Sequence, residues 1–265
     1  MSEIKCYETL PAGYYQDRAN QHINWPLHYL GRKALQKFLE VEQRGQKLTV
    51  VAPDSVYDAA WKRRPVLVAA THRSWMDISF FVQATQAVWL SHTRPLSKIE
   101  NLQKHPALSR YYHDVGLFGA VRDDPDLEGI ELVFASDYKK HRNDLVFPEG
   151  TRVLQDIEHV ASYARTPAMM AIKYGFGISS LAIVGGGVGE TQPSRHLIRG
   201  KRIPVADTPV AQFGDVIYLP HQPDLSPKEL VRQAGIATRT ILRPDLQQTL
   251  DIAYGTRAML MGQAA

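Results

Sequence analysis

The sequence predicts an α/β protein in which a mainly parallel β-sheet is flanked by helices and preceded by an N-terminal amphipathic helix. Short apolar segments typical of strands alternate with segments whose apolar residues recur at helical spacing, and this alternation favours parallel strands covered by helices. The 265 residues can bury a substantial core, and no internal repeat or biased segment divides them. We therefore expect a helical segment over residues 1–45 and one α/β domain over residues 46–265.

The N-terminal segment contains one amphipathic helix. Asn24 suits the N-cap position and Pro26 suits the first turn that follows it. From Leu27 to Phe38, apolar side chains recur at helical spacing with basic residues beside them. Such a stripe either packs on its own domain or rests on a lipid interface, and the sequence does not choose between the two.

The strands of the domain are expected where short apolar runs occur, at residues 48–52, 66–70, 145–147, 181–184 and 216–219. Helices are expected at residues 75–86 and at residues 166–173, where a Thr-Pro pair opens the helix and Gly175 follows its end. A capping box, Ser-Pro-Lys-Glu, begins another helix at Ser226. Pro244 is expected to interrupt that helix before a final helical stretch.

Composition restricts the classes of function. A net charge of +4 and a pI near 9.1 suit phosphorylated ligands, an anionic membrane surface or an acidic carrier protein. The basic clusters are short and have no aromatic ladder, so no nucleic-acid partner is expected. The ten histidines show no metal-ligand spacing, and we expect neither a metal nor another cofactor.

Cysteine content and hydropathy indicate where the protein works. Cys6 is the only cysteine, which excludes an intrachain disulfide and favours a cytoplasmic location. The first residues lack the apolar core of a signal peptide, and no run of eighteen apolar residues occurs. Membrane contact, where it exists, is expected to be peripheral on the inner face.

A first polar block follows the apolar run 66–70. His72 comes directly after it, and Asp77 lies five positions later. Histidine exchanges a proton near neutral pH, and a nearby carboxylate can hold the imidazole in one tautomer. Ser74 and Asp77 also have the spacing of a helix-capping pair, which accounts for both of them but not for His72. Taken alone, the block leaves capping and catalysis open.

A second polar block, Phe-Pro-Glu-Gly-Thr-Arg at residues 147–152, follows another apolar strand. Its proline and glycine predict a tight, exposed turn from which Glu149, Thr151 and Arg152 project. An arginine beside a hydroxyl offers a fork of donors to phosphate, and Gly150 permits a close approach of the backbone. Both blocks follow predicted parallel strands, so they are expected to share the rim where open α/β sheets bind ligands.

Together the two blocks resemble the His-x4-Asp and Phe-Pro-Glu-Gly-Thr-Arg motifs of the glycerolipid acyltransferases, the lysophosphatidate acyltransferase superfamily. Residues 116–122 resemble that family's second block, which ends in a phosphate-binding arginine, here Arg122. Residues 213–215, Phe-Gly-Asp, resemble a late segment, so the resemblance covers residues 48–219. The chain departs from the family in two ways: residues 179–183 lack the usual proline, and no membrane-spanning helix precedes the motifs.

The resemblance implies acyl transfer from a thioester, acyl-CoA or acyl carrier protein, to a hydroxyl of a phosphorylated glycerolipid such as 1-acyl-glycerol-3-phosphate. It implies that His72 is the general base and that Asp77 orients it. It further implies that the acceptor is bound by Arg122, Glu149, Gly150, Thr151 and Arg152. The lysophospholipid could be replaced by another hydroxylated acceptor, since the two departures from the family bear on the acceptor.

Three other functions fit parts of the sequence. The main alternative is a non-catalytic module of the same fold that binds an acyl thioester or phospholipid. A hydrolase could use His72 to activate water, but residues 177–181, Gly-Ile-Ser-Ser-Leu, lack the final glycine of a serine-esterase elbow. A nucleotide site at the glycine-rich residues 185–189 fails the dinucleotide pattern at Glu190.

Overall fold

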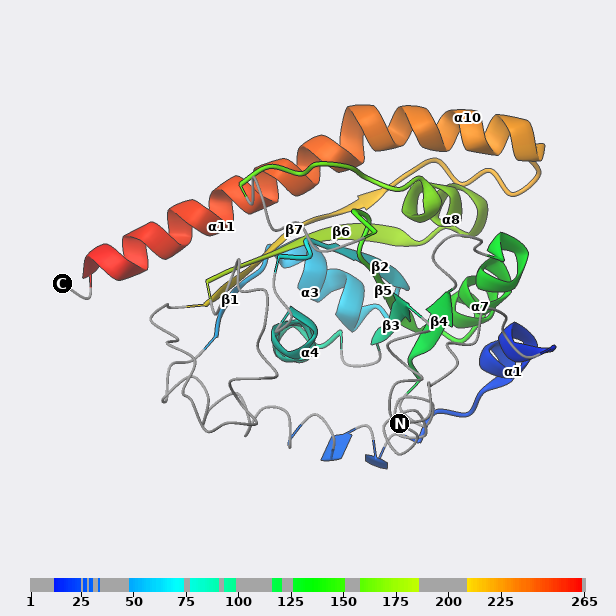
Figure 1. Ribbon diagram of the computed structural model, residues 1–265, viewed down its shortest axis with the longest axis horizontal. Coiled ribbons are helices and arrows are strands. Elements are labelled where there is room, and N and C mark those ends of the chain that lie inside the picture. Colours follow the sequence, from blue (N-terminus) through cyan, green and yellow to red (C-terminus); the bar gives the residue numbers. More distant parts are fainter. Residues whose placement is uncertain are drawn as a thin grey trace, which may run out of the picture.

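The computed structural model describes residues 12–24, 26–27, 29–30, 33, 48–73, 77–90, 93–98, 116–120, 126–150, 158–185 and 209–263. These residues form a seven-stranded sheet in the order β1-β7-β6-β2-β5-β3-β4. β6 and β7 are antiparallel, and every other neighbouring pair is parallel. Helices cover both faces of the sheet (Figure 1). The predicted fold class, a mainly parallel sheet flanked by helices, is confirmed.

The strands are β1 (Thr49–Val51), β2 (Val66–Ala70), β3 (Thr93–Lys98), β4 (Phe118–Ala120), β5 (Asn143–Val146), β6 (Gly177–Val184) and β7 (Val210–Tyr218). β2 has the predicted bounds, and β1 and β5 lie within two residues of theirs. β6 and β7 are longer than predicted, because each strand is stabilised along its length by the antiparallel ladder with the other. β3 and β4 were not predicted.

The helices are α1 (Tyr14–Asn20), α3 (Asp54–Trp61), α4 (Asp77–Ala87), α7 (Leu127–Lys139), α8 (Thr166–Tyr174), α10 (Pro227–Ala237) and α11 (Arg243–Gln263), with a π-helical segment η1 (Thr238–Leu242) between the last two. The Ser226 side chain caps α10 by accepting from the Glu229 N–H, at 3.3 Å. Pro244 interrupts the α-helical hydrogen bonding, because it has no N–H to donate. The chain nevertheless continues through η1 as one long helical arm (Figure 1).

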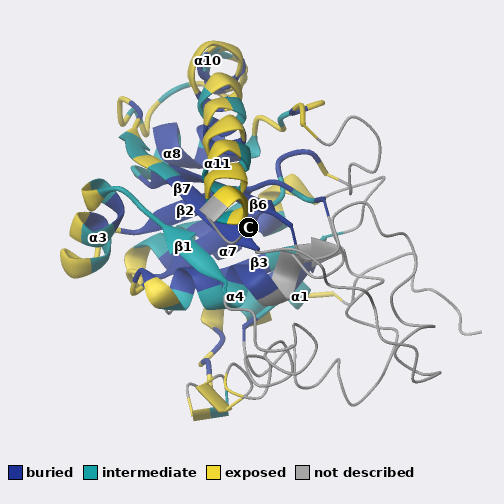
Figure 2. Cartoon of the chain, turned by 90° about the vertical axis from the view of Figure 1, so that its left-hand side faces the viewer, coloured by how far each residue is buried: buried dark blue, intermediate teal, exposed yellow. Residues whose placement is uncertain are grey.

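The sheet separates two apolar layers. Alternate residues of β2 point to opposite faces, so Val66 and Val68 pack with α3 and α4, whereas Leu67 and Ala69 pack with α1, α7, α8 and α10. α11 covers β6 and β7 on the side opposite α3 and α4, through Leu246 and other apolar residues. Figure 2 shows the buried sheet beneath the exposed outer sides of α10 and α11. The rim of the sheet therefore lies between two filled cores.

The predicted start of the N-terminal helix at Asn24 is confirmed, and the helix α1, which was not predicted, precedes it. The Asn24 carboxamide oxygen accepts from the Leu27 N–H at 3.1 Å, as expected for an N-cap, and residues 26, 27, 29, 30 and 33 are helical. Phe38 lies outside the described residues. Within the described part of the chain, no helix combines the length and apolar character needed to cross a membrane.

Candidate active site

The two polar blocks meet at one rim of the sheet. His72 follows β2 by two residues, and the turn at Pro148 and Gly150 follows β5. β2 and β5 are parallel neighbours, with Ala69 opposite Val146, so both segments leave the sheet side by side. The prediction that the blocks share a rim is confirmed for the residues that the structure describes.

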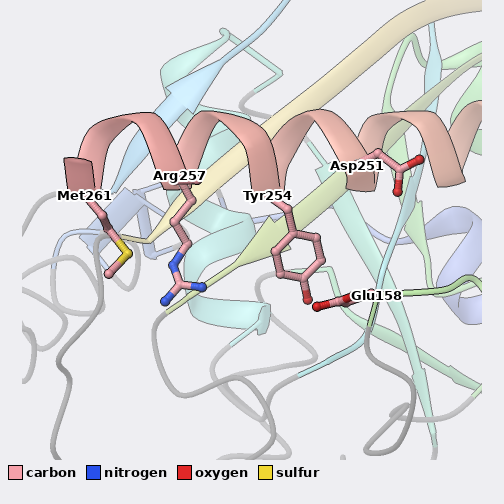
Figure 3. A pocket seen from close by; sticks show the side chains of 6 residues that line it. Glu158, Asp251, Tyr254, Arg257 and Met261 are labelled. Atoms are coloured by element: carbon pink, nitrogen blue, oxygen red, sulfur yellow. The ribbon is translucent and has the colours of Figure 1, made fainter. Parts of the chain in front are cut away.

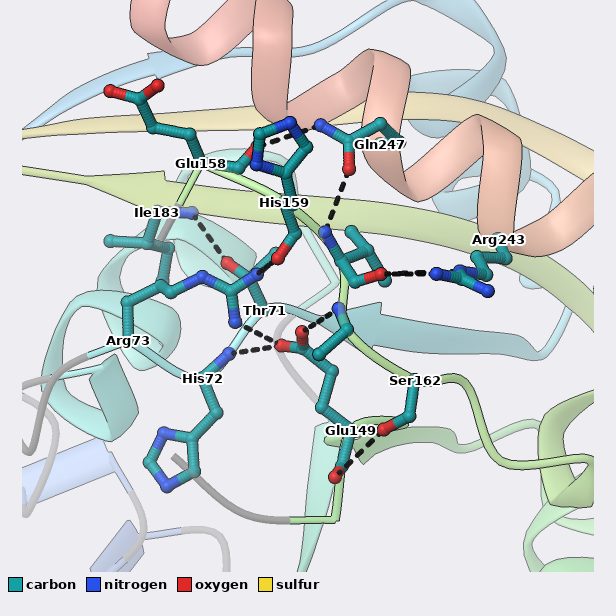
Figure 4. A network of polar contacts seen from close by, with 12 residues as sticks. Thr71, His72, Arg73, Glu149, Glu158, His159, Ser162, Ile183, Arg243 and Gln247 are labelled. Carbon is teal, nitrogen blue, oxygen red and sulfur yellow. Dashed lines mark hydrogen bonds and ion pairs between the residues drawn. The ribbon is translucent and has the colours of Figure 1, made fainter. Parts of the chain in front are cut away.

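A buried ion pair joins the blocks. Arg73 and Glu149 have fully buried side chains, and the Arg73 guanidinium donates from Nη1 to Glu149 Oε2. The His72 backbone N–H donates to the same oxygen at 3.3 Å. Figure 4 shows this network, with the imidazole of His72 directed away from the ion pair. Glu149 thus fixes the backbone at the residue whose side chain is the candidate base.

The position of Glu149 corrects one expectation. The sequence predicted that it projects from an exposed turn, but its side chain is buried and its second oxygen, Oε1, accepts from the Ala161 N–H at 3.4 Å. The physical reason is Arg73, because a guanidinium that is buried behind the rim requires a carboxylate nearby.

The same arginine also ties a third segment to the rim. Arg73 Nη2 donates to the carbonyl oxygen of His159 at 3.0 Å, and the Ala164 N–H donates to the carbonyl oxygen of Pro148 at 2.7 Å. The segment after β2, the turn after β5 and the segment before α8 are therefore joined by hydrogen bonds and a buried ion pair. Such support from neighbouring groups is what a functional side chain needs for a fixed orientation.

His72 itself is only partly buried. Its ring stacks on Phe147, with centroids 4.4 Å apart and planes inclined by 26°. The preceding residue, Thr71, is fully buried; its N–H donates to the Leu181 carbonyl oxygen at 2.9 Å, and its hydroxyl accepts from the Ile183 N–H at 3.3 Å. The imidazole thus stacks on one aromatic ring, directly after a residue that is hydrogen-bonded to β6.

Gly150 adopts a backbone conformation suited to glycine. Its φ is +71°, and its N–H donates to the Phe147 carbonyl oxygen at 2.9 Å, which closes the turn. A Cβ built on Gly150 would meet no atom within 4 Å. The backbone here faces open space, as the prediction of a close backbone approach requires.

The remaining predicted residues lie outside what the structure describes. Asp77 begins α4, but its side chain is not among the described ones, and Arg122, Thr151 and Arg152 are outside the described ranges. Their roles remain predictions. Sequence reasoning missed Arg73; the available signal was that Arg73 and Glu149 hold similar positions, each shortly after an apolar strand.

A hollow of about 450 Å³ lies beside the His159 segment, under the last turns of α11 (Figure 3). It is lined by Glu158, Asp251, Tyr254, Arg257, Ala258 and Met261. Burial raises the pKa of Tyr254, and the Arg73 charge acts in the opposite direction. The size suits a small ligand or part of one. Among the described residues, no three or more His, Cys, Asp or Glu side chains gather as metal ligands.

Comparison with known proteins gives a likeness to solved structures but none to families or curated proteins. No family model matches the sequence, and no curated protein matches it. Among solved structures, the chain is similar to the 1-acyl-sn-glycerophosphate (LPA) acyltransferase PlsC from Thermotoga maritima, with 20% sequence identity, a TM-score of 0.46 and coverage of 88% of each chain. The residues at the rim are therefore the features of this chain that indicate a function.

Proposed function

We propose that this protein is an O-acyltransferase that moves a fatty acyl group from a thioester, acyl-CoA or acyl carrier protein, to a hydroxyl of a phosphorylated glycerolipid such as 1-acyl-glycerol-3-phosphate. One observation carries the proposal: the hydrogen bond from the His72 N–H to Glu149 joins the two blocks that resemble acyltransferase motifs. These blocks are 77 residues apart in sequence, and a chance resemblance would not require them to touch.

The chemistry needs a base at the rim. An alcohol is a weak nucleophile at neutral pH, so the His72 imidazole removes its proton while the oxygen attacks the thioester carbonyl carbon. The new C–O bond forms, the C–S bond breaks, and the thiolate leaves with the proton that the imidazolium returns. Asp77 is proposed to hold the imidazole in the required tautomer.

The other residues position the reactants. Arg122, Thr151 and Arg152 are proposed to bind the phosphate of the acceptor and so direct its hydroxyl toward His72. The open backbone at Gly150 leaves room for that acceptor. Both carboxylate oxygens of Glu149 accept hydrogen bonds from the protein. We therefore assign Glu149 a positioning role instead of contact with the acceptor.

The proposal also covers the co-substrate, the partners and the location of the enzyme. The acyl thioester is a co-substrate, and the reaction needs no resident cofactor. The donor and the lysophospholipid acceptor are the expected partners. Peripheral contact with an anionic membrane on the cytoplasmic side would bring the enzyme to a lipid acceptor.

Product analysis tests the proposal. The protein is incubated with acyl-CoA and acyl carrier protein donors and a panel of lysolipids, and the products are identified by mass spectrometry. His72→Ala should lower turnover by about 10²–10⁴-fold, with unchanged circular dichroism. The matched control is His221→Ala, because His221 is an exposed histidine at the opposite end of the sheet, 3.1 Å from the Lys173 carbonyl oxygen.

Each outcome distinguishes a function. Near-normal turnover by His72→Ala would refute the role of the base. Thioester binding without any acylated product would favour the binding module, and fatty acid release without an acceptor would favour a hydrolase.

A further inference from the structure

The end of the sheet opposite the candidate active site carries exposed aromatic and basic side chains. Here α3, α4 and α7 end and the parallel strands β2, β3 and β5 begin; β7, which is antiparallel to β6, finishes there. We call this surface the basic–aromatic edge and define it by Trp61, Arg63, Arg64, Trp89, His141 and Tyr218. None of these residues takes part in the rim described above.

Three of these residues have a strained backbone. Among the described non-glycine residues, positive φ occurs at Arg63 (52°), Trp89 (62°) and His141 (52°). Each stands two residues beyond the end of a helix, where glycine is the usual residue because it has no Cβ. Instead, each position presents a large, solvent-exposed side chain. Strained backbone of this kind is a reason to look for a function.

Hydrogen-bond and ring contacts connect the segments that form the edge. His141 Nδ1 lies 3.2 Å from the carbonyl oxygen of Arg63, and the Arg64 guanidinium lies over the Tyr218 ring, 5.7 Å from its centroid. The Trp89 ring packs edge-on against Tyr57, with centroids 5.8 Å apart. Tyr57 is one turn of α3 before Trp61, so segments far apart in sequence form one surface.

The aromatic side chains project into water. Trp61 is 78% exposed, Trp89 is 63% exposed and Tyr218 is 46% exposed. Two tryptophans so far exposed are unusual for a surface without a partner, because burying such rings is strongly favourable. Tryptophan is enriched at the boundary between water and lipid, where its apolar ring and its N–H both find suitable surroundings.

The edge is positively charged. The Lys62 ammonium is paired with the Asp58 carboxylate, with Nζ and Oδ1 2.7 Å apart. Arg63, Arg64 and Lys139 add exposed positive charge at the ends of α3 and α7. Cations close to a membrane surface are attracted by acidic lipid headgroups. Charge and exposed aromatics together match an anionic bilayer.

We propose that the basic–aromatic edge binds the surface of an anionic phospholipid bilayer, with Trp61 and Trp89 inserted among the headgroups. α4 connects this edge with the active-site rim. It begins at Asp77, five residues after His72, and spans 11 residues, or about 16 Å, before Trp89. A chain that lies with this edge toward the bilayer keeps the rim about one helix length from the membrane contact.

Vesicle flotation tests this surface without any reliance on acyl transfer. The full chain is mixed with vesicles of phosphatidylcholine and phosphatidylglycerol in equal parts, and with phosphatidylcholine alone. We expect the protein to float with the anionic vesicles and to be released by high salt. Arg63→Gly should weaken the binding about fivefold, and Trp89→Gly should weaken it further and reduce the blue shift of tryptophan emission.

A stability measurement separates this role from a structural one. Arg63→Gly relieves the left-handed strain, so its melting temperature should be equal to or above that of the unchanged protein, although its binding is weaker. Lys228→Gln and Met259→Ala are matched controls. They remove an exposed charge and an exposed apolar side chain from α10 and α11 and should leave flotation unchanged.

Several results would overturn the proposal: no flotation of the unchanged protein with anionic vesicles at low salt, equal flotation of Arg63→Gly, or an equal loss in either control. Poly-L-glutamate serves as a soluble probe for an acidic protein surface. Retention on it that is lost in Arg63→Gly, with no vesicle binding, would assign the edge to an acidic protein instead.

Discussion

Replacing Glu149 with glutamine tests whether the buried ion pair holds the rim together. The change leaves the fully buried Arg73 guanidinium without its counter-charge. Removal of one partner from a buried pair costs about 3–5 kcal/mol, because the other charge stays buried without the carboxylate that compensated it. For a chain of this size, about 2–4 °C is lost per kcal/mol. The melting temperature of Glu149→Gln should therefore fall by at least about 6 °C.

Thermal unfolding and urea unfolding are both followed by circular dichroism, and a second variant removes both charges of the pair. Arg73→Met combined with Glu149→Gln removes both charges of this pair, and the amide oxygen can still accept from the His72 N–H. This double variant should be more stable than Glu149→Gln alone. Glu229→Gln is the matched control, since it breaks the exposed pair with Arg232 and should leave the urea midpoint unchanged.

The stabilising role of the Arg73–Glu149 pair would be refuted if Glu149→Gln unfolded at the same urea concentration as the unchanged protein. It would also be refuted if the double variant were less stable than the single one, because the loss would then come from packing instead of an isolated charge.

Two further predictions concern stability away from the rim. Burial, and then the neighbouring Asp137 carboxylate, raise the pKa of Asp144 well above 3.8. The folded chain therefore keeps a proton that the unfolded chain releases, and stability falls as pH rises above about 4. Asp144→Asn should be more stable than the unchanged protein near pH 7, and the two urea midpoints should converge near pH 3; a constant difference would contradict the raised pKa. Gly175→Ala should lower the free energy of unfolding by about 1–2 kcal/mol in thermal denaturation, because φ is +91° there and the new Cβ would lie 3.0 Å from the Tyr138 hydroxyl; unchanged stability would argue against that backbone conformation.

The strands that the sequence predicts are those with a strong local signal. β2 is an unbroken apolar run that is buried on both faces, and this pattern is typical of a central parallel strand. β3 was missed, because its sequence Thr-Arg-Pro-Leu-Ser-Lys is polar. It is nevertheless a strand, paired in parallel with β5 and β4, and its Arg94 is buried and paired with Asp137 of α7, through Nη1 at 2.6 and 2.7 Å. That partner is 43 residues away, so local sequence carries no sign of it.

The candidate site likewise has features that local sequence predicts and features that it does not predict. The position of His72 after a strand and the tight turn at Gly150 could be predicted, since both depend on neighbouring residues. The burial of Glu149 could not be predicted, because it depends on Arg73, 76 residues earlier. The basic clusters near Arg63 and His141 are visible in the sequence, but their union into one edge depends on where α3 and α7 end.

The sequence by itself determined which segments are strands and helices with strong local patterns, and which side chains can perform acid–base and phosphate chemistry. Tertiary structure alone decided that β2 and β5 are neighbours and that a buried guanidinium selects Glu149 as its partner. It also decided that Trp89 and Tyr218 lie beside α3 and the basic residues that follow it. The physical reason is the distance along the chain over which each interaction acts. Periodicity and turn chemistry act over a few residues, whereas burial and charge pairing depend on groups that only the folded chain brings together.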